Sequence, residues 1–274
     1  MMNDNKPQRE LSVEEIISQS FHMYRARFVL FLLPFLVAAI ITGVFASVIF
    51  WYFPFPATPS PSASSQAIID WFNAFFSTFI VIMILIVIVS LVISTIATGI
   101  VVKCVSDIIE KGSSTLKEGF TFTMSKLVSL LVAEIIVVIV TVIGSLFFIV
   151  PGLIFMVMFS LVVPVIIVEQ KGVFESLERS RKLVSNRWMK TFVLLIIVSL
   201  IVGVVSWITM IVTAPFGTSL GTANLFAFSS TSLFISYIIT AFVTPIFPIA
   251  TNFLYYSMVA RELQRMPPPP PPFL

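Results

Sequence analysis

The stretch FIVIMILIVIVSLVISTIATGIVV, residues 79–102, decides the fold class, because no charged side chain interrupts it. A bilayer core about 30 Å thick is crossed by roughly 20 apolar residues in an α-helix. The quoted stretch reaches that length and belongs to an apolar segment that begins at residue 72. The sequence therefore predicts a transmembrane helix here.

Similar apolar segments lie on both sides of this one. The chain of 274 residues is 58% hydrophobic and only 11% charged, whereas a soluble domain is roughly a quarter charged. Polar, Pro, Gly and Ser residues separate six predicted spans, at residues 28–53, 72–102, 127–150, 153–168, 191–213 and 231–259. We therefore predict an all-α integral membrane protein, with a single membrane domain over residues 1–266 and no large soluble domain.

The connections between the predicted spans differ in length and composition. Residues 54–70 are expected to form a Pro/Ser-rich loop, residues 150–152 a tight turn, and residues 214–230 a Gly/Ser/Thr loop. The span at 153–168 is short and contains Pro164, so it is either strongly bent or part of a re-entrant hairpin. Pro245 and Pro248 should bend the last span.

The basic residues are segregated along the chain. All 16 Lys and Arg lie in the N-terminal arm, in residues 103–126, in residues 171–190, or at Arg261 and Arg265. Basic residues beside membrane spans are retained on the cytoplasmic side. The pattern therefore predicts a multi-pass protein of the cell membrane with both termini in the cytoplasm, which an even number of spans satisfies.

A pattern with steps of three and four residues precedes the first, third and fifth spans, and each copy closes with a basic residue followed by an apolar one. Its members are Val13, Ile17, Ser20, Tyr24, Arg27 and Phe28 in the first copy, Leu116, Gly119, Thr123, Lys126 and Leu127 in the second, and Val173, Leu177, Ser180, Val184, Arg187 and Trp188 in the third. These steps place each set on one stripe of a helix.

The pattern predicts three hairpins in repeat units of about 12–102, 112–168 and 172–260, each preceded by a cytoplasmic amphipathic helix at the membrane interface. Arg27, Lys126 and Arg187 would then reach lipid phosphates at the membrane edge. The alternative, strongest for the second copy, is that any helix approaching a membrane is amphipathic and basic.

Glu134 is the one Asp, Glu, Lys or Arg within the predicted spans. It lies eight residues past Lys126, hence roughly 12 Å along the helix. A carboxyl at that depth is a candidate functional site, although it could also face a hydrated vestibule or bond a neighbouring helix. Thr95, Ser199 and Asn252 are expected at comparable depth, and Asn252 is the predicted partner of Glu134 in an inner-leaflet polar layer.

No catalytic constellation emerges from the motifs. Residues 217–221 match G-x-S-x-G around Ser219, but the only histidine, His22, is predicted on the opposite side of the membrane, so the match is interpreted as accidental. With a single cysteine, Cys104, and scattered carboxylates, the sequence predicts no metal site. It contains no nucleotide-binding loop, so no cofactor is predicted. The basic run at 179–190 indicates contact with anionic lipids and not with nucleic acid.

The C-terminal residues 267–272 form a run of six prolines within a tail at 267–274. Such a run adopts polyproline II, which serves as a stiff spacer or as a docking ligand. The spacer interpretation is preferred here, since no basic Pro-rich recognition pattern extends beyond Arg265.

Two stretches, GVFESLERSRKLVSNRWMKTFVLL at 172–195 and TPIFPIATNFLYYSMVAREL at 244–263, resemble elements of the membrane domain attached to some glycerophosphodiester phosphodiesterases and of its stand-alone prokaryotic relatives. The matching residues are Ser180, Arg187, Trp188, Tyr255, Tyr256 and Arg261. The position after the tyrosines, often acidic in such relatives, is Ser257 here. The resemblance implies a helical membrane module without catalysis of its own.

These observations predict a non-enzymatic multi-pass membrane module that engages lipid or a membrane-protein partner. The interfacial helices and the inner-leaflet polar layer would form its contact surface. The alternative hypothesis is a small-molecule or ion transporter or channel with Glu134 as its ion or proton site.

Overall fold

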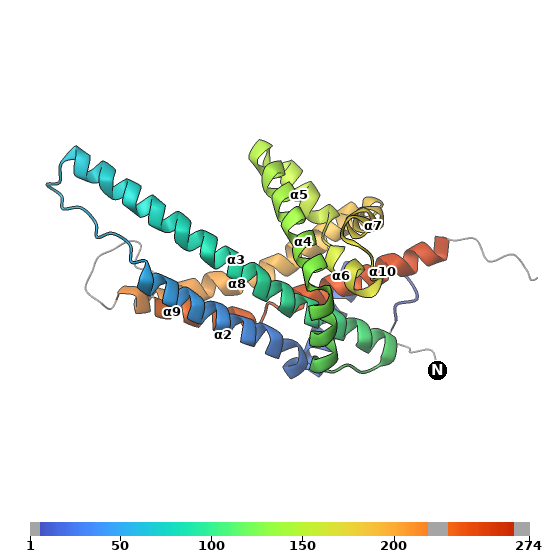
Figure 1. Cartoon of the computed structure of the whole chain (residues 1–274). Helices are drawn as coiled ribbons and strands as arrows, with labels where there is room; N and C mark the ends of the chain where they lie inside the picture. The colour runs from blue at the N-terminus through green and yellow to red at the C-terminus, as the bar shows by residue number, and fades with distance from the viewer. Residues whose placement is uncertain (1–5, 219–229, 266–274) are drawn as a thin grey trace, which may run out of the picture. The chain divides into compact units, whose positions relative to one another are not determined.

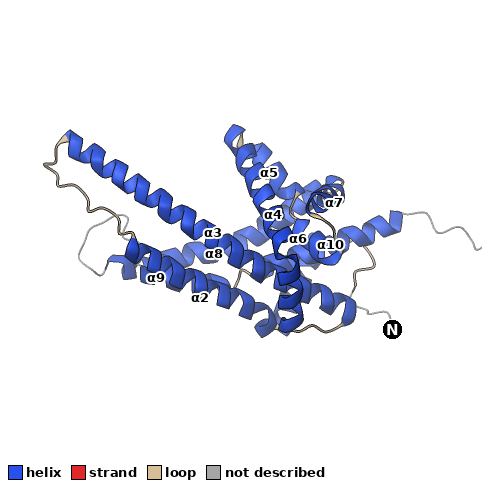
Figure 2. Cartoon of the chain, viewed as in Figure 1, coloured by secondary structure: helices blue, strands red, loops and turns tan. Residues whose placement is uncertain are grey.

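The computed structural model describes residues 6–218 and 230–265, and every regular element in this part of the chain is a helix (Figure 2). Figure 1 labels them in chain order. Their bounds are α1 Val13–Ala26, α2 Phe28–Tyr52, α3 Ser65–Lys111, α4 Leu116–Phe147, α5 Ile149–Met158, α6 Val162–Val168, α7 Val173–Ser185, α8 Trp188–Thr218, α9 Ser230–Ala241 and α10 Ile246–Arg265. The all-α prediction is confirmed.

Six stretches of helix in the described residues are long and apolar enough to cross a membrane. They are Phe28–Tyr52, Ser65–Lys111, Leu116–Phe147, Ile149–Val168, Trp188–Thr213 and Ser232–Arg265. Many of their large apolar side chains are exposed, including Leu146 at 79% and Ile149 at 76%. Exposed apolar surface on this scale fits a multi-pass membrane protein, in which lipid covers it.

Two predicted connections are shifted in the structure. Helix α3 begins at Ser65, so the second part of the predicted 54–70 loop is helical, and the Ser64 hydroxyl accepts the Ala67 N–H at 3.2 Å. The predicted turn at 150–152 falls instead at Phe148, the residue before α5. Pro151 lies in the first turn of α5, where a missing N–H costs nothing because that donor has no partner within the helix.

The fourth and last spans are each divided into two helices. Residues 159–161 separate α5 from α6, and Pro164 lies in the first turn of α6. Residues 242–245 separate α9 from α10, so the bend predicted from Pro245 and Pro248 takes the form of a break. The fourth span thus has the interruption that its Pro164 and short length indicated.

The described residues group into two compact units, and α2, α3 and α8 each contribute to both. Unit 1 lies within Met1–Pro34, Thr95–Leu200 and Pro245–Leu274, and unit 2 within Phe35–Ser94 and Ile201–Thr244. These boundaries cut across the predicted repeat units, which stay a prediction.

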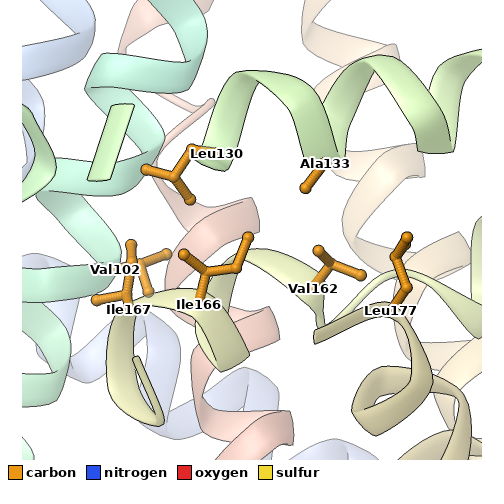
Figure 3. Close-up of a cluster of buried hydrophobic side chains, with 7 residues drawn as sticks. All are labelled: Val102, Leu130, Ala133, Val162, Ile166, Ile167 and Leu177. Atoms are coloured by element: carbon orange, nitrogen blue, oxygen red, sulfur yellow. The ribbon is translucent and has the colours of Figure 1, made fainter. Parts of the chain in front are cut away.

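The core of unit 1 forms where α4 meets α6. Leu130 and Ala133 of α4 face Val162 and Ile166 of α6, and all four are at most 2% exposed (Figure 3). Beside this core α4 and α5 form a close helical hairpin (Figure 1). A Cβ added at Gly152 would lie 1.9 Å from the Ser145 hydroxyl oxygen, so glycine is required for this approach.

Unit 2 has a smaller core and a large exposed aromatic group. Ala46 of α2 packs with Ile82 and Ile86 of α3, and Tyr237 of α9 packs against them. Aromatic residues crowd the end of α2, the following loop and the start of α3; they include Trp51, Tyr52, Phe55, Trp71, Phe72, Phe75, Phe76 and Phe79. The Trp71 indole N–H donates to the Pro56 carbonyl at 3.2 Å, which ties the loop to α3.

Candidate functional site

Within unit 1, Glu134 of α4 does form a hydrogen bond with another span, but its partner is Thr95 of α3. The Thr95 hydroxyl donates to a Glu134 carboxylate oxygen. The prediction that Asn252 of α10 is the partner of Glu134 is wrong. Asn252 is fully buried, and its amide donates to the Val102 carbonyl at 2.8 Å and to the Ser106 hydroxyl at 3.0 Å.

The error has a geometric cause. Counting residues from a basic edge gives a depth along the helix axis, but it does not give the direction in which a side chain points around that axis. Thr95 belonged to the set expected at this depth and is 1% exposed, whereas Ser199 is exposed on α8. The observed polar contacts of Glu134 and Asn252 therefore both run to α3.

The three basic residues predicted at the membrane interface have different surroundings. Arg27 lies between α1 and α2 and donates to the Gly112 carbonyl at 3.3 Å. Arg187 lies between Asn186, the C-cap of α7, and the start of α8. Lys126 lies inside α4, which is continuous from Leu116 to Phe147. A separate helix before the third span is thus absent from the described chain, and no Gly, Pro or Asn near Lys126 would end one.

The middle stripe residues of the predicted pattern are buried in all three copies. Ser20, Gly119 and Ser180 pack inside unit 1. The Ser180 hydroxyl donates to the Met158 carbonyl at 2.8 Å and accepts the Leu161 N–H at 3.2 Å. A side chain of α7 therefore bridges the break between α5 and α6.

A basic cluster that the sequence did not predict forms around Glu10, which precedes α1. One Glu10 carboxylate oxygen accepts from Arg187 Nε and from Lys190 Nζ, each at 2.9 Å. The other lies 3.1 Å from Arg187 Nη2 and 3.4 Å from Arg261 Nε. We call these four residues the Glu10 cluster. Burial raises the pKa of Glu10, but the hydrogen bonds and charges of Arg187 and Lys190 outweigh it and lower the pKa below its usual value.

The backbone beside Glu10 is held as well. The Leu11 N–H donates to the Ser257 hydroxyl at 2.9 Å, and Lys190 donates to the Leu11 carbonyl. Lys190 is also within 3.5 Å of the Ser257 hydroxyl oxygen. Ser257 is fully buried, so it anchors the N-terminal arm to α10.

A second ionic network joins α7 to α10 and to the residue after α6. Arg179 donates to Glu262 at 2.6 and 2.8 Å and to Glu169 at 2.9 Å, while the Tyr255 hydroxyl donates to Glu169 at 3.0 Å. Burial raises the pKa of Glu169, but bonds from Lys171, Arg179 and Tyr255 outweigh it, so the pKa is lowered. The hydrogen bond with Glu262 raises the pKa of Arg179 above its usual value, so the ion pairs stay charged.

The middle and later parts of the chain match a known protein family. Residues 73–257 match the family described as Domain of unknown function (DUF7847), and this match covers more than half of the chain. The chain belongs to the DUF7847 family. Neither the curated proteins nor the solved structures contain a match to it.

The DUF7847 match includes Glu134, Asn252, Arg179 and Arg187, whereas Glu10 lies outside it. The family description names no activity. The resemblance to the membrane domain of glycerophosphodiester phosphodiesterases stays a prediction.

A pocket of about 550 Å³ in unit 1 lies beside the N-terminal arm. Its lining comes from the arm, from the end of α3 and from the end of α10: Lys6, Pro7, Gln8, Ile109, Glu110, Ala260, Leu263 and Gln264. Tyr256 donates to Glu110 at 2.8 Å, and the Lys6 ammonium lies 5.8 Å from the centre of the Tyr256 ring. The tyrosines of the family resemblance thus serve as hydrogen-bond donors to acidic residues.

The sequence contained a signal for some of these contacts and none for others. Lys103, Asp107 and Lys111 stand at helical i,i+4 spacing, and both amines contact the Asp107 carboxylate, at 2.8 and 2.9 Å. Glu10 lies far in sequence from Arg187, so no periodic pattern could have linked them. Only the folded chain brings them together.

The remaining candidate residues do not converge on a reaction centre in the described chain. His22 is exposed on α1, and Cys104 is buried with a free thiol. The described residues contain no group of three potential metal ligands. Ser219 and the polyproline run lie outside the described residues.

Proposed function

We propose that this protein is a non-enzymatic multi-pass membrane module that engages anionic lipid through the basic side of unit 1. The observation that carries the proposal is the distribution of charge between the units. All 16 Lys and Arg and 12 of the 13 Asp and Glu fall within the residue ranges of unit 1, which gives it a formal net charge of +4, whereas Asp70 is the one Asp, Glu, Lys or Arg within those of unit 2. A basic surface next to a bilayer attracts anionic headgroups, by about 1 kcal/mol for each Lys or Arg near the surface.

The same distribution supports a topology with both termini in the cytoplasm. Basic residues flank the parts of α2, α3, α8 and α10 that belong to unit 1. The aromatic group of unit 2 lies at the junction of α2 and α3, with Trp51 77% and Tyr52 67% exposed. Exposed Trp and Tyr prefer the membrane–water interface, so this junction fits the outer face.

Helices α1 and α7 are the proposed interfacial elements. On α1, Ile16, Ser20 and Tyr24 are buried while His22 and Arg25 are exposed. On α7 one stripe is likewise buried, and Arg181 and Lys182 of the opposite face are exposed; the buried residues are Ser176, Leu177, Ser180, Leu183 and Val184. The exposed faces carry both signs of charge, with Glu14 beside Arg25 on α1 and with Glu175 and Glu178 beside Arg181 and Lys182 on α7. A helix with one face packed on protein and the other charged suits the headgroup region.

A set of charge-neutralising variants tests lipid engagement. The full chain is reconstituted in phosphatidylcholine vesicles with phosphatidylglycerol, and spin-labelled lipids report the ratio of the two lipids at the protein surface. We expect a several-fold preference for phosphatidylglycerol that falls with added salt and with Arg181→Gln/Lys182→Gln. Asp70→Asn, in unit 2, should not lower it. An equal ratio for both lipids at low salt would refute the proposal.

The second candidate function is transport, with Glu134 as an ion or proton site. It is favoured by the hydrogen bond from Thr95 to a carboxyl within a span. Proteoliposomes loaded with a pH-sensitive dye test it. Proton flux that Glu134→Gln abolishes, with folding intact, would support transport, and flux equal to that of empty vesicles would exclude proton transport.

A further inference from the structure

Residues 6–12, which we call the N-terminal segment, are bound to the rest of unit 1 by a set of polar contacts and by the buried Leu11 side chain. Glu10 joins Arg187, Lys190 and Arg261, Leu11 joins Ser257, and the Gln264 side chain donates to the Gln8 carbonyl at 2.9 Å. The segment contains no helical turn. Leu11 is also buried, at 6% exposed. The attachment therefore combines one apolar side chain with polar contacts that centre on the Glu10 carboxylate.

The Glu10 cluster is unbalanced in charge. Three cations face one carboxylate, which leaves two positive charges in excess among the four side chains. Arg261 is only 8% exposed, and its buried Nε has no hydrogen-bond partner within residues 6–218 and 230–265, although it lies 3.4 Å from Glu10. A buried guanidinium donor without a partner is costly, so the cluster has unused capacity for an anion.

The donors match a phosphate group. A phosphate monoester offers three terminal oxygens and a charge between one and two units negative, where a carboxylate offers two oxygens and one charge. Guanidinium groups bind such oxygens in pairs, and an ammonium adds a point charge. The Ser257 hydroxyl, within reach of Lys190, would add a further donor once Leu11 leaves.

We propose that Arg187, Lys190, Arg261 and Ser257 form a binding site for a phosphate monoester, and that Glu10 occupies this site until the phosphate displaces it together with the N-terminal segment. The phosphate is carried by a lipid headgroup or is a free ion, and the chemistry of recognition is shared. The lipid version rests on the proposed function, because it requires an anionic lipid at the basic side of unit 1. The free-ion version does not.

Displacement is measured on the full chain in detergent, with spin labels at Pro7→Cys and Leu263→Cys and with Cys104→Ala to remove the native thiol. The probes are dioctanoyl phosphatidic acid, inorganic phosphate, and dioctanoylglycerol, which has the same chains without phosphate. We expect phosphatidic acid to lengthen the label distance and dioctanoylglycerol to leave it unchanged. A response to inorganic phosphate alone at the same concentration assigns the site to the free ion.

Charge variants supply the second measurement. Glu10→Gln should release the segment without ligand and tighten phosphate binding about tenfold, since one charged hydrogen-bond set no longer competes. Glu14→Gln makes the same charge change on an exposed residue of α1 and should leave both readouts unchanged. Arg187→Gln should weaken binding, whereas Lys117→Gln, at an exposed residue of α4, should not.

Gln264→Ala removes only the bond to Gln8, so it tests release if Glu10→Gln fails to fold. It should lengthen the label distance in the direction of Glu10→Gln, by less. The proposal is overturned if phosphate binds with the segment in place, if Glu10→Gln leaves affinity unchanged, or if dioctanoylglycerol releases the segment equally. Preference for anionic lipid combined with any of these results would retain the proposed function and eliminate only this site.

Discussion

Removal of the Ser180 hydroxyl should open the break between α5 and α6. This hydroxyl accepts the N–H of Leu161, which is fully buried, and donates to the half-buried carbonyl of Met158. In Ser180→Ala both backbone groups lose this partner, and burial within the protein keeps water from replacing it at the Leu161 N–H. The structure thus predicts that a single oxygen on α7 stabilises the broken fourth span.

The magnitude follows from the two groups that are left unpaired. A buried unsatisfied donor costs about 1–3 kcal/mol, and the half-buried carbonyl costs less. We expect Ser180→Ala to lower the free energy of unfolding by about 2–4 kcal/mol. Ser176, also on α7, is the matched control, because it is equally buried and its hydroxyl has no partner in the described chain. Ser176→Ala should fall within about 0.5 kcal/mol of the parent or be more stable.

Unfolding is measured by SDS titration of the purified protein in mixed micelles, followed by tryptophan fluorescence. Hydrogen–deuterium exchange supplies the local readout, since the Leu161 amide should exchange faster in Ser180→Ala and not in Ser176→Ala. Equal stabilities for the two variants, with unchanged exchange at Leu161, would refute the reasoning.

Three further predictions concern other contacts. A double-mutant cycle of Thr95→Val and Glu134→Leu should give a coupling of about 0.6–1.7 kcal/mol, and zero coupling would contradict the observed bond. Gly152→Ala should lower the free energy of unfolding by about 1–3 kcal/mol, whereas Gly203→Ala, with nothing within 4 Å of the added Cβ, should not destabilise. Because the pKa of Glu169 is lowered on folding, its contribution to stability is complete above the unfolded pKa of about 4.3. That contribution should disappear as the pH falls through the folded pKa, and Glu169→Gln should show a weaker acid dependence in the same titration.

Much of the architecture could be predicted because membrane spans are local features of the chain. An apolar run without charges must become a helix whatever its neighbours are, since each backbone group bonds within the helix. The sequence thus predicted the six apolar stretches and a bend near Pro245, which the structure shows as a break between α9 and α10. The prediction placed the start of α3 too late, because the polar residues of Ser65–Asp70 were assigned to a loop although polar residues can also form a helix. It also misplaced the turn before α5, because Pro151 is tolerated in the first turn of a helix.

The sequence by itself determined which residues are too polar for their surroundings, and Glu134 and Asn252 were both found in this way. Only the tertiary structure decided their partners. Helical rise sets depth, but the rotation of each helix about its axis depends on packing against all of its neighbours, so Glu134 meets Thr95 and Asn252 meets Ser106. The Glu10 cluster shows the same limit, since its residues are joined by ion pairs that leave no periodic trace along the chain.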